Sequence, residues 1–236
     1  LDLPLLAMDY ATWSEQALKL SKLDNRIGLS ARWRKQLKLT DADAPLVETD
    51  AINLAKLFTQ YLHACREDEN ALSTLPPGRF LMPGDMEGSP ALTFCPLPAS
   101  GPIIPDSLYA TMAERYEAYK TFVIKPFFRD HFARLDRQII LVDALQAINA
   151  GPAALNDLEN ALAEILGCFN PGQSNWLTSI FTRRIDRILF AATKVDHLHQ
   201  ENHKALENVL SKLVDNASKR AKFAGASVNV IALASL

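Results

Sequence analysis

The sequence predicts an α/β protein in which a mainly helical segment, residues 1–136, precedes a parallel β-sheet formed within residues 137–236. The first observation is a set of three short apolar runs rich in β-branched residues: QIILVD (138–143), RILFAAT (187–193) and SVNVIALA (227–234). The second is that amphipathic helical stretches, 152–166 and 201–222, separate these runs. Strands that alternate with helices of this length are typical of parallel crossover units.

Composition is that of an ordinary globular protein. The chain has 236 residues, 48% of them hydrophobic, and a net charge of -2. This balance excludes intrinsic disorder, and the near-neutral charge excludes a global cationic field that would attract nucleic acid. No apolar run is long enough to cross a bilayer, and the start, LDLPLLAMDY, lacks the basic region of a signal peptide. Three cysteines without paired spacing predict free thiols and a cytoplasmic location.

The two ends of the chain predict a piece of a longer protein. The first residue is Leu1 rather than Met, and the last, Leu236, follows an apolar run that reads as a strand. Natural chains rarely end inside a buried strand. Three strands form about half of a doubly wound sheet, so we expect the remainder of the sheet upstream, and poor solubility of this half alone.

Apolar residues at helical spacing predict the helices of the first segment. Each stretch places its members on one helix face. The faces are Leu6, Tyr10, Trp13, Ala17 and Leu20; Leu54, Phe58, Tyr61 and Cys65; and Met112, Tyr116, Tyr119 and Val123. A short basic helix is predicted over 29–39. The helix that carries Leu54, Phe58, Tyr61 and Cys65 is expected to have Thr49 or Asp50 as its N-cap. The face that begins at Met112 belongs to a helix predicted over 107–125.

Between these helices, residues 75–105 are rich in proline and glycine. The segment contains Pro76, Pro77, Pro83, Pro90, Pro96, Pro98, Pro102 and Pro105, together with Gly78, Gly84, Gly88 and Gly101. Neither a helix nor a central strand tolerates this density. The segment is therefore predicted to be a long ordered loop, a kind of element that often serves function.

In the second segment, we expect the run 138–143 to be a strand buried on both faces, because it is continuously apolar. The helix 201–222 is predicted to turn one set of apolar residues inward: Leu206, Leu210, Leu213 and Ala217. A further short helix is predicted around Trp176, Ile180 and Phe181. Ligands of parallel sheets bind beyond the carboxyl ends of the strands, so the residues that follow each strand deserve inspection.

The second strand is followed by Thr193-Lys194-Val195-Asp196. The pattern Asn/Thr-Lys-x-Asp after a strand is the guanine-reading loop of P-loop GTPases. An Asp carboxylate can accept two hydrogen bonds from the ring N–H and the exocyclic amine of guanine, and adenine offers no such pair of donors. The stem of Lys194 can lie across the base, and the hydroxyl of Thr193 can hold the loop. The alternative interpretation is a solvated turn after a strand.

After the third strand, Ala234 and Ser235 are small residues that permit close approach of the backbone to a base, or simply pack as a strand end. The chain contains neither the phosphate loop G-x-x-x-x-G-K-S/T nor a D-x-x-G element after a strand. If the protein binds a nucleoside triphosphate, both elements must lie upstream of Leu1. We therefore predict no catalytic residue and no metal ligand within this chain.

Other candidates are weaker. The histidines near the motif, His197, His199 and His203, lack a thiolate or carboxylate at ligand spacing, so a polar helix start is the preferred interpretation. Residues 63 and 65 are too close in sequence to share a helix face, which disfavours a His–Cys dyad. The basic residues of 32–38 form either a solvated face or a surface for acidic lipid or a protein. Asp143 either carries chemistry or caps the next turn.

Three long blocks resemble the signature segments of the YcjX-like family of bacterial, stress-associated P-loop proteins. They are PGRFLMPGDMEGSPAL (77–92), HFARLDRQIILVDALQAINAGPAALNDLENAL (131–162) and RRIDRILFAATKVDHL (183–198). The resemblance extends over the whole chain. It implies a Ras-like nucleotide domain interrupted by a large helical insertion. In this family the phosphate loop and a D-Y-P-G-E-W switch segment precede the region covered here.

The resemblance therefore implies that residues 1–136 are the insertion and 137–236 the C-terminal part of the nucleotide-binding domain. It implies GTP or GDP binding, GTP hydrolysis with Mg²⁺ in the intact protein, and a cytoplasmic, stress-related role. Thr193, Lys194 and Asp196 match the base-specificity motif, and Ala234 with Ser235 the following loop. Two alternatives stay open: a non-catalytic helical module that binds a protein or a membrane surface, and an ATP-using member of the same fold.

Overall fold

A computed structural model describes residues 2–99, 101–131, 137–168, 187–223 and 227–234 of the chain. The chain divides into two compact units. The helical unit comprises Leu1–Glu67 and Leu75–Pro126, and the sheet unit comprises Asp68–Thr74 and Phe127–Leu236. The predicted helix around residues 176–181 lies outside the described residues. Within the described ranges, no helix combines the length and apolarity that a bilayer crossing requires.

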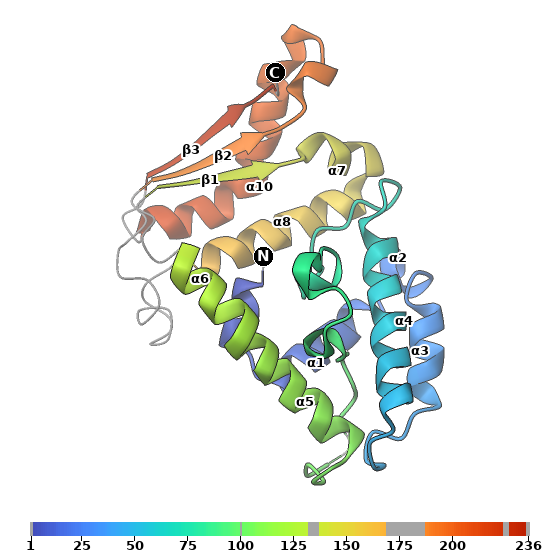
Figure 1. The fold of residues 1–236 in the computed structure, drawn as a ribbon. Helices are drawn as coiled ribbons and strands as arrows, with labels where there is room; N and C mark the ends of the chain where they lie inside the picture. The colour runs from blue at the N-terminus through green and yellow to red at the C-terminus, as the bar shows by residue number, and fades with distance from the viewer. Residues whose placement is uncertain (1, 100, 132–136, 169–186, 224–226, 235–236) are drawn as a thin grey trace. The chain divides into compact units, whose positions relative to one another are not determined.

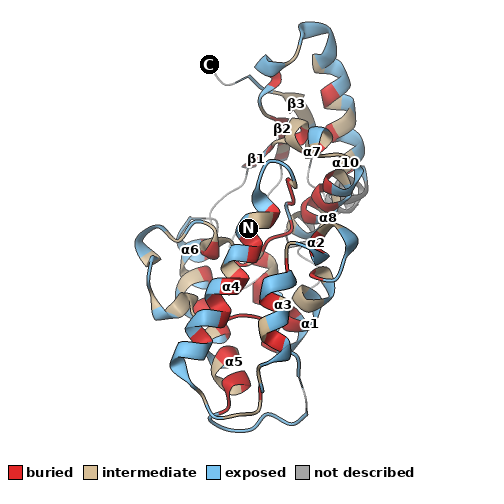
Figure 2. Ribbon diagram, turned by 90° about the vertical axis from the view of Figure 1, so that its right-hand side faces the viewer, coloured by how far each residue is buried: buried red, intermediate tan, exposed pale blue. Residues whose placement is uncertain are grey.

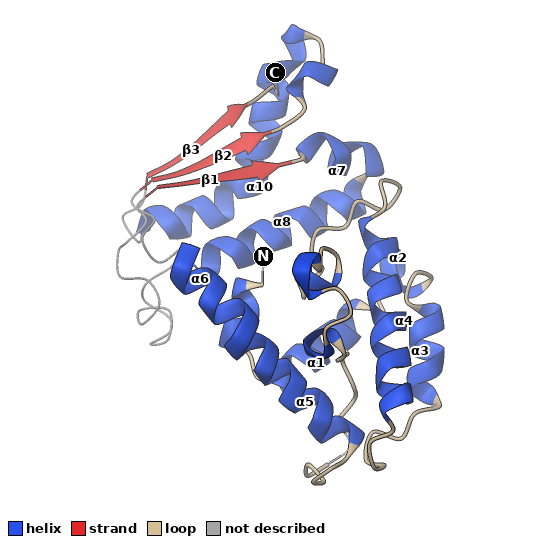
Figure 3. Ribbon diagram, in the orientation of Figure 1, coloured by secondary structure: helices blue, strands red, loops and turns tan. Residues whose placement is uncertain are grey.

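The helical unit contains α1 (Tyr10–Leu20), α2 (Asp24–Ile27), α3 (Ala31–Lys38), α4 (Glu48–Arg66) and α5 (Leu108–Tyr119) (Figures 1 and 3). A π-turn over Lys120–Ile124 continues α5 into α6 (Lys125–His131). Short 3₁₀ turns cover Leu3–Ala7, Gly78–Phe80, Gly84–Met86 and Pro90–Leu92.

Aromatic side chains form the core of the helical unit. The ring of Trp13 stacks on Tyr116 with centroids 4.9 Å apart, and Trp33 stacks on Tyr61 at 5.6 Å. All four residues of the predicted α4 face, Leu54, Phe58, Tyr61 and Cys65, are buried. The helical periodicity therefore identified this face correctly. Stacked rings of this kind stabilise a core beyond the area that they bury.

The predicted N-cap of α4, Thr49 or Asp50, is wrong by two or three residues. The helix begins at Glu48, and Val47 occupies the N-cap position without a side-chain hydrogen bond. Thr49 and Asp50 lie inside the first turn. Acidic side chains there interact favourably with the positive end of the helix dipole, and Glu48 and Asp50 supply them. Charge in the first turn thus takes the place of the expected cap.

The predicted face of the helix over 107–125 is correct for α5 and fails beyond it. Ser107 caps α5, its hydroxyl accepting a hydrogen bond from the backbone N–H of Ala110 at 3.1 Å. After Tyr119 the chain widens into the π-turn, which accommodates an extra residue and shifts the inward face. Ile124 is consequently buried, whereas Val123 is only partly buried.

The described residues of the proline- and glycine-rich segment, 75–99 and 101–105, form 3₁₀ turns and irregular backbone, as predicted. Side chains of α1 make hydrogen bonds to backbone groups of this segment, which forms no regular backbone hydrogen-bond pattern of a helix or sheet there. The hydroxyl of Tyr10 donates to the carbonyl of Cys95 at 2.7 Å and accepts from the N–H of Leu97 at 3.1 Å. Ser14 Oγ donates to the carbonyl of Leu97 at 2.6 Å. These bonds satisfy buried backbone groups that would otherwise destabilise the fold.

Cys65 and Cys95 are buried and carry reduced thiols. Burial raises the pKa of the Cys95 thiol to about 12, so at pH 8 only about one thiol in 10⁴ is the reactive thiolate. We expect Cys95 to resist iodoacetamide at pH 8 in the folded protein and to react once urea unfolds it. Mass spectrometry of the alkylated peptides measures this, with Cys95→Ser as the control. Rapid alkylation in native buffer would contradict the burial.

The sheet unit is built on three parallel strands in the order β1 (Arg137–Val142), β2 (Arg187–Ala192) and β3 (Ser227–Ala232). Its helices are α7 (Ala144–Ala150), α8 (Pro152–Cys168) and α10 (His203–Phe223), with 3₁₀ turns at Val195–His197 and Gln200–Asn202. The prediction of three parallel strands with helical crossovers is confirmed, and strand ends differ by at most two residues.

One face of this sheet packs against helices α7, α8 and α10 (Figures 1 and 3). Phe190 of β2 is fully buried there, and Leu206 and Leu210 of α10 are buried as predicted. Leu213 is only partly buried because Val214 takes the inward position. The side chain of Ala217 lies outside the described residues. The apolar contacts of β2 with the helices form the core that holds the carboxyl end of the strand in place.

The expectation that β1 is buried on both faces is wrong for this chain. Ile140 and Val142 are buried, but Ile139 and Leu141 are 63% and 64% exposed. Figure 2 shows the mixture of buried and exposed positions along the unit. Alternate residues of a strand point to opposite faces, and the described helices of the sheet unit pack on only one of them. An uncovered face is unusual for a parallel sheet.

Candidate functional site

The carboxyl ends of the three strands lie at one edge of the sheet. Val142 pairs with Ala192, which pairs with Ala232. The ladder continues one residue further: the N–H of Thr193 donates to the carbonyl of Val142 at 3.0 Å, and the N–H of Leu233 donates to the carbonyl of Ala192 at 2.7 Å. The residues that follow each strand therefore start from the same level of the sheet.

In the loop after β2, buried and exposed residues alternate. Val195 is buried in the core of the sheet unit, whereas Lys194 and Asp196 are exposed. Lys194 adopts the left-handed conformation, with φ of 61°, and a 3₁₀ turn over Val195–His197 follows. Thr193 Oγ1 lies 3.4 Å from the carbonyl of Val142 and adds a hydrogen bond to the one made by its backbone. The hydrogen bonds of Thr193 and the burial of Val195 thus hold the loop that carries Lys194 and Asp196 at the sheet edge.

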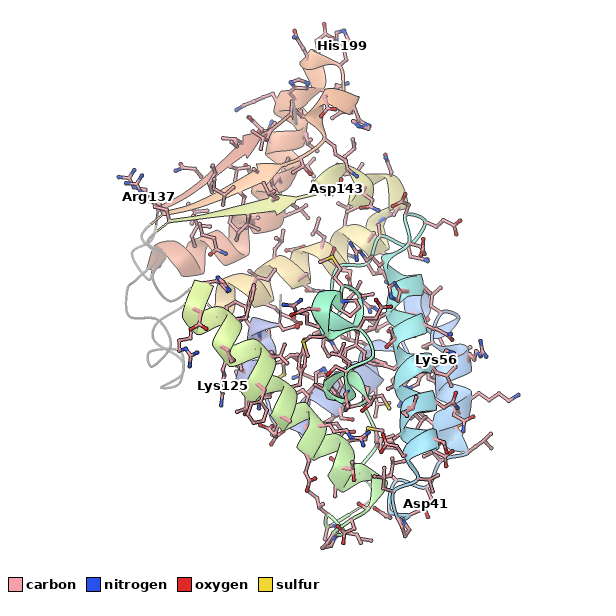
Figure 4. The ribbon with its side chains drawn as sticks, in the orientation of Figure 1. Asp41, Lys56, Lys125, Arg137, Asp143 and His199 are labelled. Carbon is pink, nitrogen blue, oxygen red and sulfur yellow. The ribbon has the colours of Figure 1, made fainter. Side chains whose placement is uncertain are left out.

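Asp143 is the first residue after β1 and performs two tasks. Its Oδ1 accepts a hydrogen bond from the N–H of Gln146 at 3.0 Å, which caps α7. Its Oδ2 lies 2.6 Å from Nζ of Lys194. The hydrogen bond and charge of Asp143 raise the pKa of Lys194, so the ammonium form is favoured. The cap is one of the two roles expected for Asp143 from the sequence, and the ion pair with Lys194 was not predicted. Figure 4 marks Asp143 at the end of β1.

Asp196 keeps its carboxylate accessible. The side chain is 43% exposed, and Oδ2 lies 3.7 Å from Nε2 of His197. The neighbouring histidines take separate local contacts: His199 lies 3.9 Å from Glu201, and Nε2 of His203 is 3.2 Å from the carbonyl of Leu198. Across the described ranges, no three His, Cys, Asp or Glu side chains gather closely enough to hold a metal ion.

At the end of β3, Ala234 is exposed, and Ser235 lies outside the described residues. The structure adds Glu207 of α10, which the sequence reasoning missed. Its Oε1 accepts a hydrogen bond from the N–H of Ala232 at 3.0 Å, and Oε2 lies 2.9 Å from Nζ of Lys204. Both contacts lower the pKa of Glu207, with the Lys204 contact the larger cause. No sequence spacing links Glu207 to a residue 25 positions later.

The structure thus brings three of the five predicted residues, Thr193, Lys194 and Asp196, into one loop beside the end of β1. Ala234 follows the neighbouring strand at the same edge. The other candidates take ordinary structural roles. Residues 63 and 65 differ in burial, with His63 exposed and Cys65 buried, so they form no dyad.

This architecture defines an α/β protein with a parallel sheet and a charged loop at the carboxyl edge of its central strand. The chain belongs to the YcjX-like family, DUF463, which it matches over residues 1–236. It is 40% identical over 245 residues to "Ras-like GTPase YcjX" of Escherichia coli (strain K12), covering 100% of this chain and 52% of that protein.

A second relative has the same name. The chain is 33% identical over 245 residues to "Ras-like GTPase YcjX" of Shewanella oneidensis (strain MR-1), covering 100% of this chain and 50% of that protein. The chain therefore spans about half the length of these curated relatives. The match covers the helical unit as well as the sheet unit, so the helical unit is part of the family's sequence.

Proposed function

We propose that this chain supplies the base-reading half of a guanine-nucleotide site in a Ras-like GTPase. The observation that carries the proposal is the Thr193–Asp196 loop at the carboxyl edge of the central parallel strand. The names of the relatives support guanine nucleotides as the ligand class. In this proposal the sheet unit is the C-terminal part of the nucleotide domain, and the helical unit is its insertion.

Asp196 is the proposed selectivity residue. Its exposed carboxylate can accept the ring N–H and the exocyclic amine of guanine, two charge-assisted hydrogen bonds that adenine cannot donate. A site built to satisfy these donors discriminates strongly against a base that lacks them. An ATP-using member of the same fold is therefore the less favoured alternative.

The other loop residues have supporting roles. Thr193 fixes the start of the loop to β1 through two hydrogen bonds to Val142. The aliphatic stem of Lys194 covers one face of the base, and Ala234 with Ser235 allows the backbone after β3 to approach the base oxygen. These assignments extend the sequence pattern to the edge where the strands end.

The phosphate groups, Mg²⁺ and the attacking water require residues outside this chain. GTP hydrolysis needs neutralisation of charge at the phosphates and a positioned nucleophile, and the sequence of this chain contains no phosphate loop G-x-x-x-x-G-K-S/T to bind the phosphates. The open face of β1, with Ile139 and Leu141 exposed, is consistent with a sheet that other segments complete. We propose that hydrolysis, a cytoplasmic location and the stress-related role belong to the longer protein.

The rival function, a non-catalytic helical module at a membrane surface, has less physical support. The four basic residues of α3, Arg32, Arg34, Lys35 and Lys38, are followed within residues 41–50 by four acidic ones, Asp41, Asp43, Glu48 and Asp50. This segment has no net charge to attract anionic lipid. A protein that binds the helical insertion remains part of the proposal.

The test is a titration with fluorescent GDP in Mg²⁺, competed with unlabelled GTP and ATP. It uses this chain and a version extended to the length of the curated relatives, hereafter the extended protein. We expect only the extended protein to bind, and GTP to compete far better than ATP. Absence of binding by both versions, or equal competition by ATP, would overturn the guanine assignment. A pull-down with anionic vesicles tests the rival function.

A further inference from the structure

Asp143 joins two elements of the sheet unit that are far apart in sequence. One carboxylate oxygen caps α7 through Gln146, and the other lies 2.6 Å from Nζ of Lys194, 51 positions later. The cap fixes the carboxylate to the start of a helix. The side chain of Asp143 is 25% exposed and that of Lys194 is 53% exposed. An ion pair with this much exposure contributes little to folding stability. Its main effect is to fix the position of the Lys194 side chain.

The cap has support from a second carboxylate. Nε2 of Gln146 donates to Oδ1 of Asp68 at 2.5 Å, and the charge of Asp68 also favours the ammonium form of Lys194. Asp68 opens the segment Asp68–Thr74, which the sheet unit holds firmly. The N–H groups of Ser73 and Thr74 donate to Oδ2 of Asp157 in α8, at 2.6 and 2.8 Å.

A continuous chain of contacts therefore runs from this segment to the base-reading loop. Asp68 accepts from Gln146, Gln146 donates to Asp143, and Asp143 pairs with Lys194. The register of β1 and β2 makes the last step possible, because both strands end at the same level. A lysine on a free loop samples many rotamers, and ordering it on ligand binding lowers affinity. An ordered Lys194 avoids most of that loss.

We propose that Asp143 is a positioning residue for nucleotide binding, which holds Lys194 ready to cover the base, with Gln146 and Asp68 holding Asp143. This inference rests on the proposed function and adds a residue outside the Thr193–Asp196 loop. Asp143 does not touch the nucleotide in this arrangement. It acts through Lys194 alone, and this restriction makes the proposal testable.

The experiment is a double-mutant cycle in the extended protein, with the Kd for fluorescent GDP as the readout. Asp143→Asn keeps the helix cap, because Asn is as good an N-cap as Asp, and removes the negative charge. We expect it to weaken GDP binding about fivefold, the scale of ordering one long side chain. In a Lys194→Met background, the same change should alter Kd by less than about twofold, because interacting residues are not additive.

The matched control is Asp9→Asn. Asp9 also caps a helix, α1 of the helical unit, by accepting from the N–H of Thr12 at 2.8 Å. It should leave the Kd for GDP unchanged. Asp143→Ser, a second variant that preserves the cap, should behave like Asp143→Asn.

Three results overturn the positioning role while the wild-type extended protein binds GDP. They are an unchanged Kd in Asp143→Asn, tighter binding in that variant, and an equal loss in the presence and absence of Lys194. Tighter binding would mean that Asp143 withholds Lys194 from the nucleotide. Failure of the wild-type extended protein to bind GDP would overturn the proposed function together with this inference, so the two failures are distinguishable.

Discussion

Replacement of Asp196 by Asn in the extended protein is expected to weaken GDP binding about a hundredfold and to create binding of xanthosine diphosphate. The loss follows from the two hydrogen bonds that the carboxylate accepts. Hydrogen bonds to charged groups contribute about 1.5–3 kcal/mol each. The amide oxygen of Asn can still accept one of the two, and the loss of the other, about 2.7 kcal/mol, corresponds to a factor of 100 in Kd.

The gain follows from the chemistry of the bases. Xanthine has a carbonyl oxygen at the position where guanine has its exocyclic amine. The side-chain amide of Asn can donate to this oxygen, whereas the carboxylate of Asp repels it. Unfolding would abolish binding of both nucleotides, so new binding of the xanthine nucleotide separates a change of selectivity from damage to the fold.

Competition titrations with GDP, xanthosine diphosphate and ADP measure the three affinities. Asp24→Asn is the control, since Asp24 is an exposed carboxylate in the first turn of α2 in the helical unit. It should not change the order of the three nucleotides. If Asp196→Asn binds GDP as tightly as the wild type, Asp196 does not read the base, and the Thr193–Asp196 loop is a solvated turn.

Local pattern was sufficient to predict much of the fold. The strands were predicted because continuous apolar, β-branched runs alternated with amphipathic helices, and the three parallel strands form as expected. The face of α4 followed from helical spacing alone, and its members are buried. These features depend on neighbours within a few residues, which the sequence displays directly.

Features that depend on distant residues were beyond the sequence. The π-turn over Lys120–Ile124 changes which apolar residue faces the core, and no residue type within this segment predicts such a turn. Apolarity of β1 suggested burial on both faces, but exposure depends on which segments are present to cover the strand.

The site shows the same division. The motif Thr193–Asp196 was visible because its members are adjacent, and the structure locates it at the edge where the strands end. The two supporting carboxylates were not assigned roles in the loop. Asp143 reaches Lys194 only because β1 and β2 are in register, and Glu207 reaches Ala232 only because α10 packs beside β3. Contacts of this kind require the tertiary structure.

Ile139→Ala is the substitution that tests whether the open face of β1 is covered in the extended protein. In this chain Ile139 is 63% exposed, and truncation of an exposed side chain changes stability by about 0.5 kcal/mol or less. A side chain buried by further segments would instead lose about 2–5 kcal/mol. We expect the larger loss, because parallel sheets are covered on both faces and the relatives are about twice as long as this chain.

Hydrogen exchange of the β2 amides in the extended protein measures the effect locally, since β2 pairs with β1 along its whole length. Phe190→Ala provides the internal scale: Phe190 is fully buried on the helix-covered face and should cost about 3–5 kcal/mol. A cost of Ile139→Ala close to that scale means that segments outside this chain pack on the open face. A cost near zero means that the face stays exposed in the extended protein, and the sheet is then not the half of a doubly wound Ras-like domain.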